Sequence, residues 1–267
     1  MIQRFSLNKF LRNSSVRVII FLMVLVFCLM KRWLQQNLPE GLKDALRIFS
    51  LRYIRRGRCG LHGMDKKLEK YLSFRDGFFV ELGANDGVTQ SNTYFLEKRR
   101  GWKGVLIEPS LNLFISCTKN RSDRNSFFCN ACVPFSYRNE FVRIDYAKLR
   151  SVSSSLENDL ESVDEFTAEG RSFLGPSQGN ISFGAEAKPL SRILDEAGSP
   201  KSIDFLSLDV EGAELEVLKG IDFDKYCIKY MLVECRDLER LSNFLAQKNY
   251  LLVDKLSYHD YLFSFKG

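Results

Sequence analysis

A glycine-rich turn near residue 80 has the residue types of a cofactor site. The apolar run Phe78–Leu82 has the sequence FFVEL, with Glu81 one residue before its end, and Gly83 and Gly87 enclose the next three residues. An apolar run closed by glycines is typical of a buried strand that enters a tight turn. Because glycine lets a ligand approach the backbone closely, the turn predicts a cofactor site. An ordinary strand-to-helix turn is the alternative, since short glycine motifs also occur by chance.

The spacing of these glycines argues against a dinucleotide. The dinucleotide fingerprint G-x-G-x-x-G has a middle glycine that admits a pyrophosphate. The spacing Gly83-x-x-x-Gly87 lacks this residue. A nucleotide-type cofactor without a pyrophosphate therefore fits the turn better.

Two further polar residues follow the next apolar runs. Glu108 ends the run KGVLIE, 25 residues after Gly83. In nucleotide-binding folds an acid about 20 residues beyond the glycine turn accepts hydrogen bonds from the ribose hydroxyls. Asn130, at the end of the run SFFCNA, could contact the adenine edge. The alternative for Glu108 is a surface acid at the end of a strand.

A second block carries the candidate catalytic acids. Residues 203–220, IDFLSLDVEGAELEVLKG, predict a buried strand, a turn and a helix that Gly220 ends. Asp209 and Glu211 follow that strand, at the edge where open α/β sheets bind their ligands. Either carboxylate could act as a general base, with His259 as the second choice. Glu211 also has a structural alternative, because an acid before a helix stabilises its N-terminus.

A metal ion is a further alternative at these acids. Oxygen ligands suit Mg²⁺, and Asp209, Glu211 and Glu234 could supply them. The sequence does not show that the three carboxylates meet, and we predict no metal site.

Apolar runs at regular intervals predict the sheet that positions these residues. Besides the two strands above, strands are expected at 103–108, 126–131, 141–146, 228–234, 250–253 and 261–265. Helices are expected at 90–100, 190–197, 213–219 and 238–248. This alternation indicates an α/β fold. The polar stretch 137–188 departs from the alternation and is the expected insertion for acceptor recognition.

The charge of the chain is unevenly distributed. Its formal net charge is +6, but residues 1–60 hold 12 of the 39 Lys and Arg and only 2 of the 33 acids. The remaining residues therefore carry a net charge of −4. A mildly acidic main domain lacks the basic surface that nucleic acids require, so we expect no nucleic-acid partner.

The N-terminal part predicts a membrane anchor. Residues 1–17 form a basic tail, and 18–33 contain the apolar run VIIFLMVLVFCLM followed by Lys-Arg-Trp. The run has 13 residues, so basic residues at its ends must extend it to span a bilayer. We expect an uncleaved single-pass anchor, with a buried core helix as the alternative. The host decides the membrane: endoplasmic reticulum or Golgi in a eukaryote, otherwise the inner membrane or the cytoplasm. Residues 34–74 are expected to form a basic helical linker before a main domain at 75–267.

Cys129 and Cys132 form the one C-x-x-C motif among seven cysteines. A redox or zinc site is one interpretation. No second C-x-x-C or His pair accompanies it, so structural thiols at the end of a strand are the better one.

Together, the FVELGANDG turn, the SNTYFLEKRRGWKGVLIEP run and the IDFLSLDVEGAELEVLKG block resemble the FkbM family of methyltransferases. The resemblance covers residues 75–265. It implies a Rossmann-like sheet of seven strands with the last antiparallel, helices on both faces, and S-adenosylmethionine as methyl donor. An acid followed by G-x-x-x-G is also similar to the first motif of such enzymes. By the same resemblance the turn residues Glu81, Gly83, Asn85, Asp86 and Gly87 bind the cofactor, Glu108 its ribose, and Asp209 and Glu211 lie beside the transferred methyl.

The resemblance also implies a reaction, most often O-methylation of a hydroxyl on a sugar, glycan or related metabolite. Two alternatives stay open. One is a membrane-anchored trafficking or binding protein that keeps the fold without turnover. The other is a methyltransferase for a protein or another small metabolite. The sequence does not indicate an oligomeric state.

Overall fold

The computed structural model describes residues 38–51, 57–146, 152–153, 156–157 and 181–267. The chain divides into two compact units, residues 1–50 and 51–267. The expected tail at 1–17 and anchor at 18–33 lie outside the described residues. Within the described part, no helix is long and apolar enough to cross a membrane. The first unit is represented by helix α3 (Glu40–Phe49).

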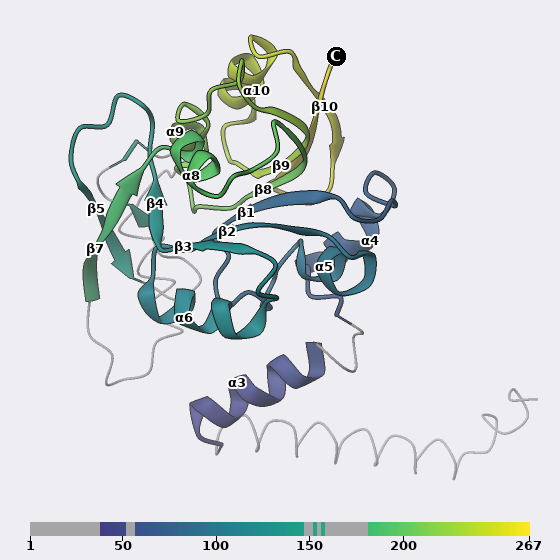
Figure 1. The fold of residues 1–267 in the computed structure, drawn as a ribbon, viewed down its shortest axis with the longest axis vertical. Coiled ribbons are helices and arrows are strands. Elements are labelled where there is room, and N and C mark those ends of the chain that lie inside the picture. Colours follow the sequence, from purple (N-terminus) through teal and green to yellow (C-terminus); the bar gives the residue numbers. More distant parts are fainter. Residues whose placement is uncertain (1–37, 52–56, 147–151, 154–155, 158–180) are drawn as a thin grey trace, which may run out of the picture. The chain divides into compact units, whose positions relative to one another are not determined.

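The second unit is built on a seven-stranded sheet (Figure 1). Its strands, in spatial order, are β10 (Tyr250–Lys255), β11 (Asp260–Phe265), β9 (Cys227–Glu234), β8 (Ser202–Leu208), β1 (Phe78–Leu82), β2 (Lys103–Ile107) and β3 (Ser126–Phe128). The last strand, β11, runs antiparallel to both of its neighbours, and the other paired strands run parallel. The structure thus confirms the expected seven-stranded α/β sheet with its antiparallel last strand.

Helices cover both faces of this sheet because its central strands are apolar on both sides. On one face α4 (Met64–Leu68), α5 (Tyr94–Arg100) and α6 (Leu111–Asn120) contribute to a core with Phe79 of β1 and Phe205 of β8. On the other face α8 (Leu190–Glu196), α9 (Glu214–Leu218) and α10 (Leu238–Ala246) pack with Val80 and Leu206 of the same strands. Figure 1 shows α8, α9 and α10 above the sheet and α5 and α6 below it.

A second, four-stranded sheet stands beside the main one (Figure 1). It consists of β4 (Asn130–Cys132), β7 (Ile181–Lys188), β5 (Phe141–Tyr146) and β6 (Val152–Ser153), in that order. The single strand expected at 126–131 is therefore wrong. The chain leaves the main sheet at Cys129 and enters the small sheet at Asn130. Cys129 and Cys132 are both free thiols.

The segment before β1 belongs to the core of the second unit. The turn η2 (Leu61–Gly63) leads into α4, and Met64, Leu68 and Leu72 are each at most 2% exposed. These three side chains pack in one cluster with Phe79 and Trp102. The second half of the segment expected as a linker, 34–74, therefore contributes apolar side chains to the core of the second unit.

Candidate active site

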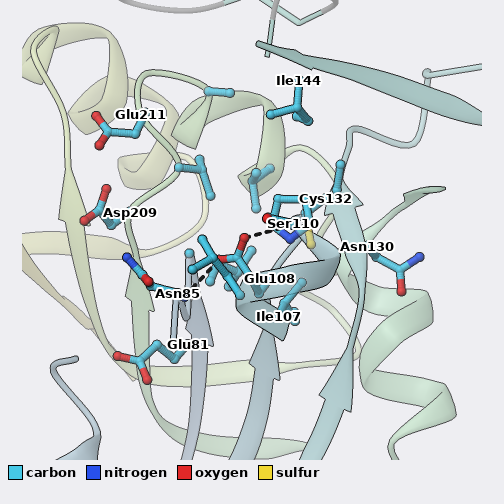
Figure 2. A pocket seen from close by; sticks show the side chains of 18 of the residues that line it. Glu81, Asn85, Ile107, Glu108, Ser110, Asn130, Cys132, Ile144, Asp209 and Glu211 are labelled. Atoms are coloured by element: carbon cyan, nitrogen blue, oxygen red, sulfur yellow. Dashed lines mark hydrogen bonds between the residues drawn. The ribbon is translucent and has the colours of Figure 1, made fainter. Parts of the chain in front are cut away.

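Four residues meet at the carboxyl edge of the main sheet because of the strand register. Leu82 at the end of β1 pairs with Ile107 of β2 and with Leu208 of β8, and Leu208 pairs with Val233 of β9. The residues that come next in the chain are Gly83, Glu108, Asp209 and Glu234. Parallel strands thus place a glycine and three acids side by side at one edge. A pocket opens at this edge and is lined by the first three of them (Figure 2).

The turn after β1 must contain glycine for a steric reason. Gly83 has φ +72°, and a Cβ atom there would lie 2.0 Å from the carbonyl oxygen of Asp209. The close approach that the sequence suggested is therefore to the neighbouring strand end. Two positions on, Asn85 also has a positive φ of 50°, and Gln90 has 59°. Left-handed residues other than glycine are uncommon, and here two of them line the same pocket.

Glu108 is the acid that the turn holds directly. Its carboxylate accepts hydrogen bonds from the backbone N–H groups of Asn85 and Ser110, each at 2.9 Å (Figure 2). The side chain is buried, and this desolvation raises the pKa of Glu108 to about 7 although the two N–H groups lower it. Each carboxylate oxygen has a second lone pair, so Glu108 can accept two more hydrogen bonds from a ligand.

Glu81 lines the pocket, but its carboxylate is bound within the protein. It accepts hydrogen bonds from the Ser91 and Thr93 hydroxyls and from the backbone N–H of Asn92. Arg121, with a fully buried side chain, donates to it at 3.1 Å. Glu81 therefore fixes the loop between the turn and α5. Because of this loop, α5 begins at Tyr94 and not at the expected Gln90. The backbone amides at the start of α5 therefore do not lie at the glycine turn.

Asp86 and Gly87 do not line the pocket. The Asp86 carboxylate accepts the backbone N–H groups of Val88 and Thr89 and the Thr89 hydroxyl. A Cβ at Gly87 would lie 2.8 Å from Arg121 and 2.9 Å from the Cys117 sulfur, so glycine here lets the turn pack on α6. Both residues stabilise the turn without lining the pocket.

Asp209 and Glu211 lie on one side of the pocket, away from Glu108 and Asn130 (Figure 2). Asp209 faces the open pocket but is surrounded by protein, and this desolvation raises its pKa well above the ordinary value. The carboxylates of Glu234 and Glu211 raise it further. Burial also raises the pKa of Glu234. Because the carboxyl groups of Asp209 and Glu234 interact, the pair titrates as a unit.

Arg236 offsets part of this negative charge. Its guanidinium lies 3.9 Å from the Glu234 carboxylate and 4.0 Å from that of Glu211. Glu211 also has a positive φ of 58°, a third left-handed residue at the pocket. A strained backbone that carries a carboxylate into a pocket is a recurrent feature of functional sites.

Two residues of the site had no clear signal in the sequence. The buried Glu214 accepts the backbone N–H groups of Val210 and Gly212 and so holds the turn that carries Glu211. An acid at the first position of a helix was the only signal for it. Arg121, which neutralises Glu81, follows α6, far from the turn in sequence, and no local pattern marks it.

His259 and Asn130 occupy different surroundings. His259 lies between β10 and β11, where its backbone N–H donates to Ser257 and its ring contacts Tyr258 with centroids 4.6 Å apart. It does not line the pocket, and it reaches the site only as a charge that lowers the pKa of Glu234. Asn130 lines the pocket from β4 and donates to the carbonyl of Glu186 at 3.3 Å.

The described lining residues give the pocket an acidic character. Four acids line it, Glu81, Glu108, Asp209 and Glu211, and no Lys, Arg or His does so among the residues that the structure describes. The small sheet contributes an apolar wall that includes Val142, Ile144 and Phe183. Within the described part of the chain, no group of three or more His, Cys, Asp or Glu is arranged to hold a metal ion. The pocket therefore suits a ligand with a positive charge and an apolar part.

Comparison with known proteins gives one family match. The family model described as a methyltransferase FkbM domain matches residues 81–261, more than half of the chain. No curated protein matches the sequence.

Several solved structures resemble the fold remotely. A methyltransferase from Geobacter sulfurreducens is 10% identical over 88% of this chain and 94% of its own, with a TM-score of 0.42. The human methyltransferase 10 domain containing protein is 14% identical over 75% and 79%, with a TM-score of 0.40. TrmK of M. capricolum, solved with S-adenosyl-homocysteine, is 12% identical over 74% of this chain and 66% of its own, with a TM-score of 0.35.

Proposed function

Because this chain belongs to the FkbM methyltransferase family, we propose that it transfers the methyl group of S-adenosylmethionine to a hydroxyl oxygen of a sugar, glycan or related metabolite. One observation carries the proposal: three acids other than the Arg121-paired Glu81 line the described part of the pocket, namely Glu108, Asp209 and Glu211, and no Lys, Arg or His does so. S-adenosylmethionine is a net cation at neutral pH, whereas a dinucleotide carries a pyrophosphate that such a pocket repels.

The chain's own residues fit the parts of this donor. Glu108 would accept the two ribose hydroxyls with the lone pairs that Asn85 and Ser110 leave open. Asn130 and the apolar wall of the small sheet would hold the adenine. The turn at Gly83 and the carboxylate of Asp209 would face the charged methionine end. When bound, S-adenosylmethionine supplies an electrophilic methyl group.

Asp209 is the proposed general base. A sugar hydroxyl is a weak nucleophile, so a carboxylate that removes its proton assists the transfer. The surrounding protein and Glu234 raise the pKa of Asp209, which makes its carboxylate a stronger base than a fully solvated one. Glu211 would orient the acceptor, since it lies at the same side of the pocket (Figure 2).

The same charge pattern restricts the acceptor. A phosphate or sulfate group in this pocket would lie near the carboxylates of Asp209 and Glu211, and no described Lys, Arg or His lines the pocket to bind it. We therefore favour an uncharged polyhydroxyl acceptor over a phosphorylated sugar or a nucleic acid.

Calorimetric titration with S-adenosylmethionine and labelled-methyl transfer to a panel of acceptors test the function. We expect micromolar binding of the donor, roughly 100-fold weaker in Glu108→Ala, since two charge-assisted hydrogen bonds are lost. Glu239→Ala removes an exposed acid on α10 and should bind the donor like the wild type.

In the transfer assay, the labelled methyl group should pass to neutral sugars, and Asp209→Asn should abolish transfer while the donor still binds. If the folded protein does not bind the donor, the proposed methyl transfer is wrong. The alternative, a protein that keeps the fold without turnover, is then favoured.

A further inference from the structure

Helix α3 carries an apolar face that methyl transfer does not use. Leu42, Leu46 and Phe49 recur at the spacing i, i+4, i+7 and so lie on one face of the helix. They expose 47, 50 and 55% of their surface. Lys43 and Arg47 lie outside this face by the same spacing. The helix is therefore amphipathic along its whole length.

The sequence around α3 is strongly basic. Residues 1–60 hold 12 Lys and Arg against 2 acids, including Lys-Arg at 31–32 and four arginines within 52–58. An anionic bilayer offers hydrocarbon beneath a layer of negative headgroups. A helix with apolar side chains on one face and basic residues beyond both ends matches this layering.

We propose that α3 lies flat in the interface of an anionic membrane. Leu42, Leu46 and Phe49 would enter the acyl-chain boundary, and the flanking basic residues would contact the headgroups. The contact would hold the methyltransferase unit at a lipid surface whether or not residues 18–33 cross the bilayer. The inference is independent of the proposed acceptor and of methyl transfer.

Tryptophan fluorescence in the full chain tests this placement. The chain has two tryptophans. Trp33→Phe removes the one that precedes α3 in the sequence, and Trp102 is fully buried and serves as an internal reference. In this background Leu46→Trp places a probe on the apolar face, and Arg47→Trp places a matched probe off it. Vesicles contain brominated phosphatidylcholine, whose bromine quenches tryptophan at acyl-chain depth, with or without phosphatidylserine.

We expect the Leu46→Trp emission to shift to the blue and to lose about half its intensity on phosphatidylserine vesicles, while Arg47→Trp changes little. Equal quenching of the two probes would overturn the flat orientation. An unquenched Leu46→Trp on vesicles that sediment with the protein would overturn insertion. A blue shift before vesicles are added would place this face against protein, in a second copy or elsewhere in the chain, and would overturn the proposal. Equal quenching without phosphatidylserine would overturn the preference for anionic lipid.

Discussion

At the scale of single residues, the acids at the pocket differ by what already binds them. Glu81 is neutralised by the buried Arg121 and by three hydrogen bonds, whereas Glu108 receives only two backbone N–H groups. Sequence position assigned both acids to the cofactor, Glu81 because it lies just before the glycine turn and Glu108 because it ends the next strand. The difference depends on Arg121 and on the loop at 88–93, which only the folded chain brings to Glu81. Glu108 and Asp209 could be predicted because strand ends and a parallel sheet suffice to place them.

The pKa of Glu108 predicts how donor binding depends on pH. Burial raises the pKa from 4.5 to about 7, so the acid is half protonated near neutral pH without ligand. Ribose hydroxyls and a cationic donor favour the carboxylate, so binding must release a proton. Donor affinity should rise with pH up to about 7 and level off above it. Calorimetry at pH 7 in buffers of different ionisation enthalpy measures the proton release, and Glu108→Ala should reduce it where Glu239→Ala does not.

Without ligand, the raised pKa of Glu108 should make the folded protein less stable as pH rises. Between pH 4.5 and about 7 the folded protein keeps the Glu108 proton and the unfolded chain loses it. The Glu108 contribution to the free energy of unfolding should therefore fall as pH rises through this window and stay constant above it. If chemical denaturation of wild type and Glu108→Ala shows the same slope with pH in this window, the assigned pKa is wrong.

Glu234 should control the pH at which Asp209 titrates, because its negative charge raises the pKa of Asp209. The ratio of donor affinity to S-adenosyl-homocysteine affinity follows this titration, because only the donor has a sulfonium charge for the Asp209 carboxylate. The pH midpoint of the ratio should fall in Glu234→Gln, which lacks this negative charge, and should stay unchanged in Glu239→Ala. A midpoint that is the same in Glu234→Gln and the wild type would show that Glu234 does not act on Asp209 through its charge.

At the scale of elements, the turn after β1 depends on the absence of one side chain. Gly83→Ala places a Cβ 2.0 Å from the Asp209 carbonyl at φ +72°, while Gly198 has φ +60° with no atom within 4 Å. Gly198→Ala should cost about 1 kcal/mol of unfolding free energy for the left-handed backbone alone. Gly83→Ala should cost about 3 kcal/mol, because the clash adds to this strain. Urea denaturation measures both, and equal costs would contradict the close approach of β1 to β8.

The loop from 88 to 93 depends on the buried Arg121. Its guanidinium donates to Glu81, Glu97, Ser91 and Thr93. Arg121→Met would leave two carboxylates buried without their cation and should cost about 3 to 5 kcal/mol of unfolding free energy. Arg124→Met, an exposed change three residues on, should cost less than about 0.5 kcal/mol. A similar cost for both variants in urea denaturation would show that the buried pairs contribute nothing net.

Most strands were predictable from their apolar runs, and the exceptions have physical reasons. The run at 126–131 contains no glycine or proline that would mark a break, yet its two halves pair with different sheets. The helix expected from Gln90 starts at Tyr94 because Glu81 and Asp86 bind the preceding backbone amides and hydroxyls. In both cases a tertiary contact overrides a local pattern, and each lies next to the pocket.

At the scale of the whole molecule, the boundary of the catalytic unit is itself testable. Residues 51–267 form one compact unit, and Met64, Leu68 and Leu72 belong to its core. Burying three such side chains contributes about 6 kcal/mol, comparable with the whole stability of a typical domain.

A chain that begins at Leu51 should therefore keep the wild-type melting temperature within about 3 °C and its donor affinity within about twofold. A chain that begins at residue 75 should not unfold cooperatively, because Phe79 and Trp102 lose the cover that α4 provides. Circular dichroism melts and calorimetry compare the two. A cooperative, donor-binding chain from residue 75 would restore the linker that the basic sequence suggested, and an unfolded chain from Leu51 would show that the N-terminal unit is part of the fold.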